Sequence, residues 1–314
     1  MAEPIQLQSR TITGHRPGPH LLVIGGVHGD EFEPMLTCRR LLREIDAAKL
    51  SGRLTVIPCV NEPAFARCQR TGEDNLDLAR VCPGDVNGSL TQRIAAALAE
   101  HIRAADALID LHTAGHRYRM LQLAGYSLHP DATVLERQRS MARAFGLPVV
   151  WGTNARFNGT SLSVARDALK PAIYVENGGG ATFDPAGVEL NVFGCRQVLR
   201  SLGMLDEPVE SRPVRYFVED DRDHSGHLQR QHPSPAAGFF VATVALGEVV
   251  TPGQVIGHVT DHLGDACHEV VAADAGVVNF LRIFPSVQAG DALLALLPIT
   301  SPGEVKYKRQ KDEV

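Results

Sequence analysis

The first two hundred residues alternate between short apolar runs and longer stretches in which apolar residues recur at helical spacing. Short apolar runs bounded by glycine, proline or charged residues are typical of buried strands. Five runs have this form: LLVIGGV (21–27), LTVIPCV (54–60), ALIDL (107–111), PVVW (148–151) and AIYVE (172–176). Because these runs are apolar on both faces and alternate with helical stretches, they predict a largely parallel sheet covered by helices on each side.

Four stretches between and after these runs have the spacing of amphipathic helices. Residues 34–49 place apolar side chains three and four apart, and two further helical patterns begin near Thr133 and Glu189. Ser89 and Gln92 stand three apart in front of LTQRIAAALAEHI, which is the pattern of a capping box at the start of a helix. The sequence therefore predicts an α/β fold for this part of the chain.

The pattern changes after Met204. Residues 206–235 are charged and contain several prolines without a sustained period, which suits a connector. In residues 236–300, short valine-rich runs alternate with glycines, which predicts a small all-β barrel or sandwich. We therefore expect a catalytic region over residues 1–205, a connector, a small β domain, and a polar, disordered tail at residues 301–314.

The composition is that of an ordinary globular protein and excludes several functional classes. The 314 residues carry a net charge of -5, and no cluster of Lys and Arg interleaves with aromatic residues, which argues against nucleic-acid binding. No apolar run approaches the roughly 20 residues that span a bilayer, and MAEPIQLQSR lacks the apolar core of a signal peptide. The six scattered cysteines suit reduced thiols. We expect a soluble, cytoplasmic protein without a membrane partner. The sequence does not determine the oligomeric state, and a homo-oligomer is compatible with it.

Polar side chains follow three of the predicted strands at their carboxyl ends. His28 and Glu31 follow the first strand, His112 follows ALIDL, and Glu176 closes AIYVE. Ligands bind beyond the carboxyl ends of parallel strands, so we expect these four side chains at one edge of the sheet. Two imidazoles and one carboxylate leave a fourth position open, which is typical of a catalytic zinc. A further carboxylate nearby could then act as general base.

Each of these residues also has a plainer interpretation. With 13 histidines and 36 acidic residues in the chain, a His-x-x-Glu pair arises easily by chance. His112 alone would be a hydrogen-bonded core histidine, and Glu176 alone would form a salt bridge at the end of a strand. Two features together favour a metal site. All four side chains follow strands at the same predicted edge of the sheet, and glycines at 25, 26, 29, 115 and 178–180 leave space beside them.

Five segments of the chain, in order, resemble motifs of the succinylglutamate desuccinylase and aspartoacylase family, which has the fold of the zinc carboxypeptidases. GGVHGDE resembles the family's G-x-H-G-x-E signature, and DNLDLARVCPG resembles its D-x-L-N-R-x-F-P-G motif. The other three segments are NEPAF followed by Arg70, DLHT at 110–113, and IYVENGGG at 173–180. The resemblance implies a zinc-carboxypeptidase-like mixed, mostly parallel sheet with helices on both faces, plus a small C-terminal all-β domain.

The resemblance also implies a role for each matching residue. His28, Glu31 and His112 would bind one Zn²⁺ per chain. Glu176 would be the general base, and Arg70 would polarise the scissile carbonyl. The implied activity is that of a zinc-dependent amidohydrolase, a deacylase that cleaves the amide bond of a small N-acyl amino acid or related N-acyl amine.

The same resemblance assigns substrate binding to Arg80, as a partner of the substrate carboxylate, and to Asp77. Here the chain departs from the family, because Ala79 stands where the family has asparagine and Cys82 where it has phenylalanine. The missing asparagine removes one donor to the substrate carboxylate. For both arginines, Arg70 included, the plainer interpretation is a solvated side chain beside Asp74 or Asp77.

Three other functions deserve comparison. A zinc carboxypeptidase acting on short peptides would use the same metal site, and a non-catalytic zinc protein would share the ligands but would need no base or arginine. The β-rich C-terminal region also suggests a biotinyl or lipoyl carrier. That function requires an exposed lysine, and the sequence has none between Lys170 and Lys306.

Overall fold

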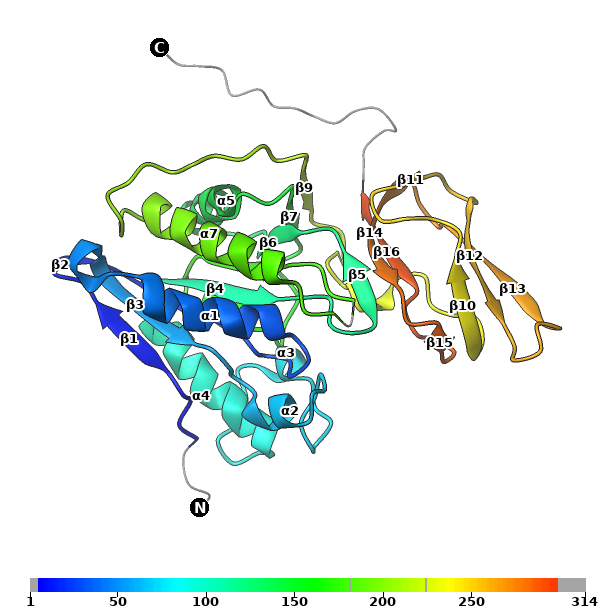
Figure 1. The fold of residues 1–314 in the computed structure, drawn as a ribbon, viewed down its shortest axis with the longest axis horizontal. Helices are drawn as coiled ribbons and strands as arrows, with labels where there is room; N and C mark the ends of the chain where they lie inside the picture. Colours follow the sequence, from blue (N-terminus) through cyan, green and yellow to red (C-terminus); the bar gives the residue numbers. More distant parts are fainter. Residues whose placement is uncertain (1–4, 181, 224, 299–314) are drawn as a thin grey trace, which may run out of the picture.

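The chain folds into a larger α/β region and a smaller β region beside it (Figure 1). The computed structural model describes residues 5–180, 182–223 and 225–298. The predicted fold class is confirmed: a mixed sheet with helices on both faces is followed by antiparallel sheets. The tail expected at 301–314 lies outside the described residues.

The larger region is built on an eight-stranded sheet with the order β1-β3-β2-β4-β8-β6-β7-β9. Strands β3, β2, β4 and β8 run parallel, β6 runs antiparallel to β8, and β7 and β9 run parallel to β6. The bounds are β1 (Arg10–Thr13), β2 (Arg16–Ile24), β3 (Ser51–Ile57), β4 (Ala107–His112), β6 (Leu123–Ser127), β7 (Val149–Thr153), β8 (Ala172–Glu176) and β9 (Tyr216–Asp220). All five predicted strands are present, whereas β1, β6 and β9 were not predicted.

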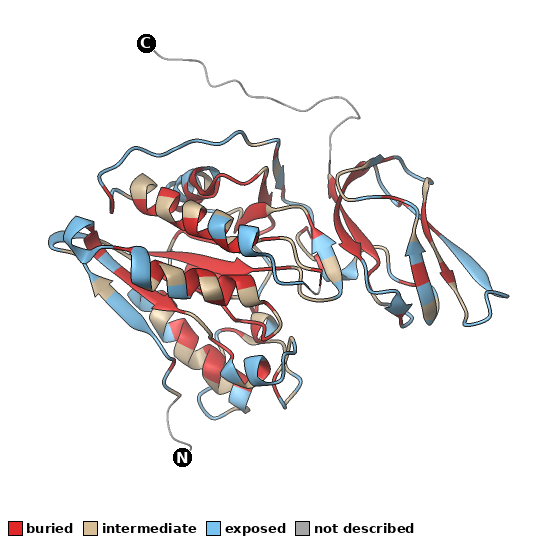
Figure 2. Cartoon of the chain, viewed as in Figure 1, coloured by how far each residue is buried: buried red, intermediate tan, exposed pale blue. Residues whose placement is uncertain are grey.

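Helices cover both faces of this sheet, and two separate apolar cores lie beneath them. One core joins the sheet to α1 (Phe32–Glu44), α5 (Ala132–Phe145) and α7 (Pro185–Ser201). The other joins it to α4 (Leu90–Ala104) and α6 (Ser161–Asp167). Two short helices, α2 (Glu62–Ala66) and α3 (Leu78–Val81), and the 3-10 turn η1 (Ala47–Lys49) lie in the loops. The buried central strands in Figure 2 match this two-sided packing.

The predicted start of α4 is confirmed. The side-chain oxygen of Gln92 accepts the backbone N–H of Ser89 at 2.9 Å, which is one half of a capping box. The hydroxyl of Ser89 donates to Asp74 at 2.6 Å, and the carboxylate of Asp74 also accepts the backbone N–H of Thr91 at 3.0 Å. Asp74 thus ties the preceding loop to the start of α4, where a negative charge is favourable.

The C-terminal region contains two small antiparallel sheets around their own apolar core. One has the order β13-β12-β10-β15, and β11, β14 and β16 form the other. The bounds are β10 (Gly238–Ala242), β11 (Val249–Val250), β12 (Val255–Thr260), β13 (Cys267–Val271), β14 (Gly276–Arg282), β15 (Ser286–Val287) and β16 (Leu294–Pro298). Strand β14 also pairs with β5 (Tyr118–Met120), which comes from the α/β region. The two regions therefore share a strand pairing.

Residues 206–235, expected as a connector, also contribute regular structure. They contain β9, the edge strand of the main sheet, and the 3-10 turn η2 (Leu228–Arg230). The strand was hard to predict because its sequence, YFVED, is short, half-exposed and surrounded by charged residues.

Two further observations bear on the sequence expectations. All six cysteines are free thiols, and three of them, Cys38, Cys82 and Cys195, are buried. Among the described residues, no helix has both the length and the apolar character needed to cross a bilayer.

The contact between the two regions generates a stability prediction. Phe280 on β14 is 3% exposed, and its ring stacks on Tyr118 of β5 with the centroids 4.2 Å apart. We expect Phe280→Ala to lower the free energy of unfolding by about 3–5 kcal/mol, because it leaves a cavity. The control, Phe239→Ala, removes a ring that is 41% exposed and should cost less than half as much. Denaturant unfolding measures both, and equal losses would contradict the prediction.

Candidate metal centre and active site

The loop between β2 and α1 carries the first two candidate ligands. β2 ends at Ile24 and α1 begins at Phe32, so His28 and Glu31 lie in a short turn at the edge of the sheet. Both side chains are buried, with His28 3% and Glu31 2% exposed. Gly29 lets this loop pack against α2, since a Cβ there would lie 2.0 Å from the carbonyl carbon of Ala64. A glycine between the ligands is therefore required by close backbone packing.

The third candidate ligand comes from the neighbouring strand. His112 is the last residue of β4, which pairs in parallel with β2. One oxygen of Glu31 lies 2.8 Å from His28 Nδ1, and the other lies 3.0 Å from His112 Nδ1. The backbone N–H of Thr113 also donates to Glu31 at 3.0 Å. One ligand atom from each of the three side chains lies within 4.8 Å of the others, so the cluster could hold a metal ion.

The far nitrogen of each imidazole faces a second carboxylate. Nε2 of His28 lies 3.0 Å from Asp77 Oδ1, and Nε2 of His112 lies 3.0 Å from Asp110 Oδ1. The hydroxyl of Ser161 in turn donates to the other oxygen of Asp110. With a metal ion in the centre, an outer carboxylate of this kind would accept the proton of Nε2 and leave the Nδ1 lone pair for the metal, as in metal-binding histidines.

The charges within the cluster are strongly coupled. Burial acts to raise the pKa of Glu31, but His28 and His112 outweigh it and hold that pKa well below its ordinary value. Burial also acts to lower the pKa of His112, yet Asp110 and Glu31 together raise it. The cluster is thus stabilised by the pairing of opposite charges inside the fold.

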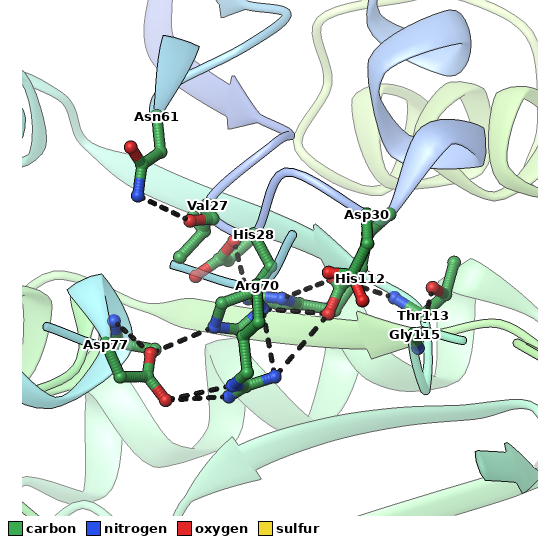
Figure 3. Close-up of polar contacts among 12 residues, drawn as sticks. Val27, His28, Asp30, Asn61, Arg70, Asp77, His112, Thr113 and Gly115 are labelled. Carbon is green, nitrogen blue, oxygen red and sulfur yellow. Dashed lines mark hydrogen bonds and ion pairs between the residues drawn. The ribbon is translucent and has the colours of Figure 1, made fainter. Parts of the chain in front are cut away.

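Arg70 enters the site beside His28 (Figure 3). Its Nε and Nη2 both donate to Asp77 Oδ2, at 3.1 and 2.9 Å. Its Nη1 lies 3.4 Å from His28 Nδ1 and 3.8 Å from a Glu31 oxygen. Asp77 stands at the start of α3, where it also accepts the backbone N–H of Ala79 at 3.0 Å. Asp77 therefore holds both His28 and Arg70 in position.

Glu176 ends β8 directly opposite His112 in the β4–β8 register. Its side chain lines the same cavity as the three candidate ligands, and its Oε2 is buried without a hydrogen-bond partner among the described residues. Burial raises the pKa of Glu176 to about 8, against the opposing effect of His112. A buried carboxyl group without a protein partner is suited to exchange a proton with a molecule in the cavity.

Arg80 lines the cavity from the end of α3. Its Nη1 donates to the carbonyl of Ala79 at 2.7 Å, and its Cζ lies 5.1 Å from the ring centre of Phe157. Among the described residues it forms no ion pair within 4.0 Å, in contrast to Arg70, whose fork is occupied by Asp77. Of the two arginines among the described residues that line the cavity, Arg80 is therefore the one whose guanidinium can bind an anionic group.

The structure brings all seven sequence-predicted residues together. Six of them line one cavity, and Asp77 lies behind His28 and Arg70. Further walls come from distant parts of the chain: Phe280 of β14, and Gly226, Leu228 and Gln229 of the range expected to be a connector. These wall residues carry no sequence signal, because only the tertiary fold brings them to the cavity.

The spacing in the sequence also indicates two other cavity residues. Asp110 precedes His112 by two positions, and Tyr174 precedes Glu176 by two. Residues two apart on a strand point to the same face, so both side chains could have been placed beside the predicted site. Both line the cavity.

The close packing around Gly29 leads to a prediction about the stability of the loop between β2 and α1. Gly29→Ala should destabilise the protein by about 1–3 kcal/mol or more, because the new methyl group meets backbone atoms of α2. Gly72→Ala is the matched control, since a Cβ there has no neighbour closer than 3.6 Å. Thermal and denaturant unfolding should separate the two variants; if both unfold like the parent, the loop is less tightly packed than the structure indicates.

Comparisons with known proteins agree with this geometry. A family model described as the succinylglutamate desuccinylase/aspartoacylase catalytic domain matches residues 17–202. The chain is 30% identical over 298 residues to N-alpha-acetyl-L-2,4-diaminobutyric acid deacetylase of Halomonas elongata, covering 92% of this chain and 85% of that protein. It is similar to the crystal structure of a succinylglutamate desuccinylase/aspartoacylase from Rhodobacter sphaeroides, with a TM-score of 0.82, 27% identity, and coverage of 92% and 87%. An ectoine utilization protein from Ruegeria pomeroyi, solved with product bound, shares the fold, with a TM-score of 0.83, 24% identity, and coverage of 92% and 87%.

Proposed function

Because the chain belongs to the succinylglutamate desuccinylase/aspartoacylase family, we propose that it is a zinc-dependent amidohydrolase that removes the acyl group from a small N-acyl amino acid. One observation carries the proposal: the convergence of His28, Glu31 and His112 beside the unpartnered carboxyl group of Glu176. The curated relative is a deacetylase, so acetyl is the first acyl group to test.

The donor set fits zinc. Two imidazole nitrogens and one carboxylate oxygen are ligands that zinc prefers, and three protein ligands leave a position for water or substrate. The outer carboxylates of Asp77 and Asp110 supply the second layer of contacts that metal-binding histidines usually have. When bound, zinc would polarise the amide carbonyl and make water a stronger nucleophile near neutral pH.

The remaining chemistry belongs to residues of this chain. Hydrolysis adds one water across the amide bond, so the acyl carbon gains an oxygen and the nitrogen leaves with one additional proton. Glu176 would take the proton from the attacking water and donate it to the leaving nitrogen. Arg70, held by Asp77, would stabilise the negative charge that develops on the carbonyl oxygen.

Substrate binding would depend on Arg80. Its guanidinium has no acidic partner and would bind the carboxylate of the amino acid, in a fork geometry for which arginine is suited. Asp77 would act through His28 and Arg70, because its oxygens are already occupied by those side chains and by the Ala79 N–H. We therefore propose a positioning role for Asp77 within the substrate-binding set.

One prediction of the proposed function concerns the metal. We expect purified protein to bind about one zinc per chain, and His112→Ala to bind less than a tenth of that, because a ligand atom is lost. His258→Ala, which removes a histidine of β12 in the C-terminal region, should keep full metal content. Elemental analysis after dialysis gives the answer, and full occupancy in His112→Ala would refute the ligand assignment.

Another prediction concerns the proposed general base. Glu176→Gln should retain zinc but lose about 10²- to 10⁴-fold in kcat, because the amide cannot accept the proton of water. Metal analysis and steady-state kinetics on the same preparation separate this effect from metal loss. A variant with more than about a tenth of the parent kcat would show that another group is the base.

The decisive experiment is a substrate screen with the zinc-loaded protein. N-acetyl, N-succinyl and N-formyl amino acids should release free amine, whereas short peptides with a free N-terminus should react far more slowly. An N-acyl amino acid should also react faster than its carboxamide, because Arg80 binds the carboxylate. If Ala79→Asn restores a missing donor, it should widen that difference. Faster hydrolysis of peptides would favour the carboxypeptidase alternative.

A further inference from the structure

The cavity extends from the metal-binding cluster across the face of the main sheet. His28 and Glu31 follow β2, Asp110 and His112 lie on β4, and Glu176 lies on β8, the next strand in the sheet. Beyond β8, the cavity is lined by residues of β6 and β7. The candidate base therefore stands between the metal-binding cluster and the far end of the cavity.

Three residues that carry hydroxyl groups line this far part of the cavity: Ser127 on β6, Thr153 on β7 and Tyr174 on β8. Ser127 and Thr153 are direct partners in the β6–β7 register. None of the three side-chain hydroxyls forms a hydrogen bond with another of the described residues. Because polar groups at a cavity wall are usually paired, these hydroxyls are available to a ligand. We call them the hydroxyl cluster.

A glycine fixes the position of the tyrosine in this cluster. Tyr174 pairs with Gly125 of β6, and a Cβ on Gly125 would lie 2.2 Å from Cε1 and Cζ and 2.5 Å from the hydroxyl of Tyr174. The phenol therefore lies across the backbone of β6, on the side of β8 away from β4. This arrangement directs the Tyr174 hydroxyl away from the metal-binding cluster and towards the strand that carries Ser127.

If the proposed function holds, the order in which Arg70, Glu176 and the hydroxyl cluster follow one another along the cavity determines how the substrate lies in it. Arg70 would stabilise the carbonyl oxygen on the side of β2 and β4, and Glu176 on β8 would serve the leaving nitrogen. The amino-acid half of the substrate then continues beyond β8, where the hydroxyl cluster lies. Its side chain would meet these hydroxyls, while its carboxylate would bind Arg80.

The charges of the cavity limit which side chains fit there. Apart from the candidate histidine ligands, the cationic residues that line it among the described parts of the chain are Arg70 and Arg80. Arg70 is neutralised by Asp77, and Arg80 would be occupied by the substrate's carboxylate. A second carboxylate would therefore meet uncharged hydroxyls in a cavity that also contains Glu31, Asp110 and Glu176. The hydroxyls could donate to that carboxylate but would not neutralise its charge, whereas they can accept hydrogen bonds from a hydroxyl or ammonium group, which the acidic side chains of the cavity do not repel.

We infer that Ser127, Thr153 and Tyr174 form the side-chain specificity site of this enzyme, and that it selects N-acyl amino acids whose side chain ends in an ammonium or hydroxyl group. An acidic side chain, such as that of aspartate or glutamate, is selected against. An enzyme for N-acyl aspartate or glutamate would have to bind two carboxylates of its substrate. Among the described residues that line this cavity, only Arg80 is an arginine without an acidic partner, and the other polar groups at the far end are hydroxyls.

The test uses four N-acetyl amino acids of matched size, whose side chains end two methylenes from Cα in a methyl, a hydroxyl, an ammonium or a carboxylate group. We expect the zinc-loaded parent protein to hydrolyse the hydroxyl and ammonium substrates with the highest kcat/KM and the carboxylate substrate with the lowest. Tyr174→Phe and Thr153→Val should each lower kcat/KM for the two favoured substrates by about threefold to tenfold, as expected for one lost hydrogen bond. The methyl substrate should change by less than about twofold.

Tyr126→Phe is the matched control, because it removes a tyrosine hydroxyl that donates to Glu219 at 2.6 Å and whose ring belongs to the opposite core. Any change in this variant should be equal for all four substrates. Highest activity of the parent on the carboxylate substrate, or equal losses on methyl and hydroxyl substrates in Tyr174→Phe, would overturn the specificity site while leaving the deacylase function intact. Release of amine from none of the four N-acetyl substrates or of their N-succinyl and N-formyl counterparts would overturn both.

Discussion

The site depends on the burial of one carboxylate, Glu31, between two imidazoles. A buried carboxylate without partners is costly by several kcal/mol, so the fold must supply its hydrogen bonds and compensating charges. Glu31 receives them from His28, His112 and the Thr113 N–H, which come from two different strands and the loops that follow. Because these contacts form only when β2 and β4 are paired, the candidate metal-binding cluster and the centre of the sheet are formed together.

The residues around Glu31 also need partners for their buried charged groups. Each imidazole is backed by a second carboxylate, and Asp77 is in turn held by Arg70. Charges of opposite sign thus alternate through the buried cluster, so that the loss of one leaves its neighbour unpaired.

The change of strand direction at β6 gives the cavity its shape. The carboxyl ends of β4 and β8 meet at one edge of the sheet, which places His112 beside Glu176. Strand β6 runs the opposite way from β8, so its last residue, Ser127, lies towards the start of β8 and away from that edge. The cavity consequently runs down the face of the sheet, with charged groups at one end and hydroxyls further in.

Much of this arrangement could be predicted from the sequence, because local patterns encode it. Apolar runs predicted five of the eight strands of the main sheet, and the polar residues at the strand ends predicted which side chains gather at its edge as candidate ligands, with Glu176 beside them. Strands β1, β6 and β9 escaped prediction because each interrupts its apolar residues with polar residues or glycine and so shows no continuous apolar run. The cavity wall at 226–229 could not be predicted at all, since its position depends on how a charged segment packs after the strands have assembled.

Ala79 shows how a local departure from a family motif acquires meaning only in the folded structure. The sequence indicates the loss of an amide donor beside Arg80, and nothing more. In the structure, the guanidinium of Arg80 lies over the ring of Phe157 and is anchored to the Ala79 carbonyl, so the arginine is oriented without an asparagine. Phe157 comes from the loop before α6, the helix whose Ser161 supports Asp110. One loop and the helix that follows it therefore contact both Arg80, through Phe157, and Asp110, through Ser161, so a single short segment supports the proposed substrate-binding arginine and the carboxylate beside His112.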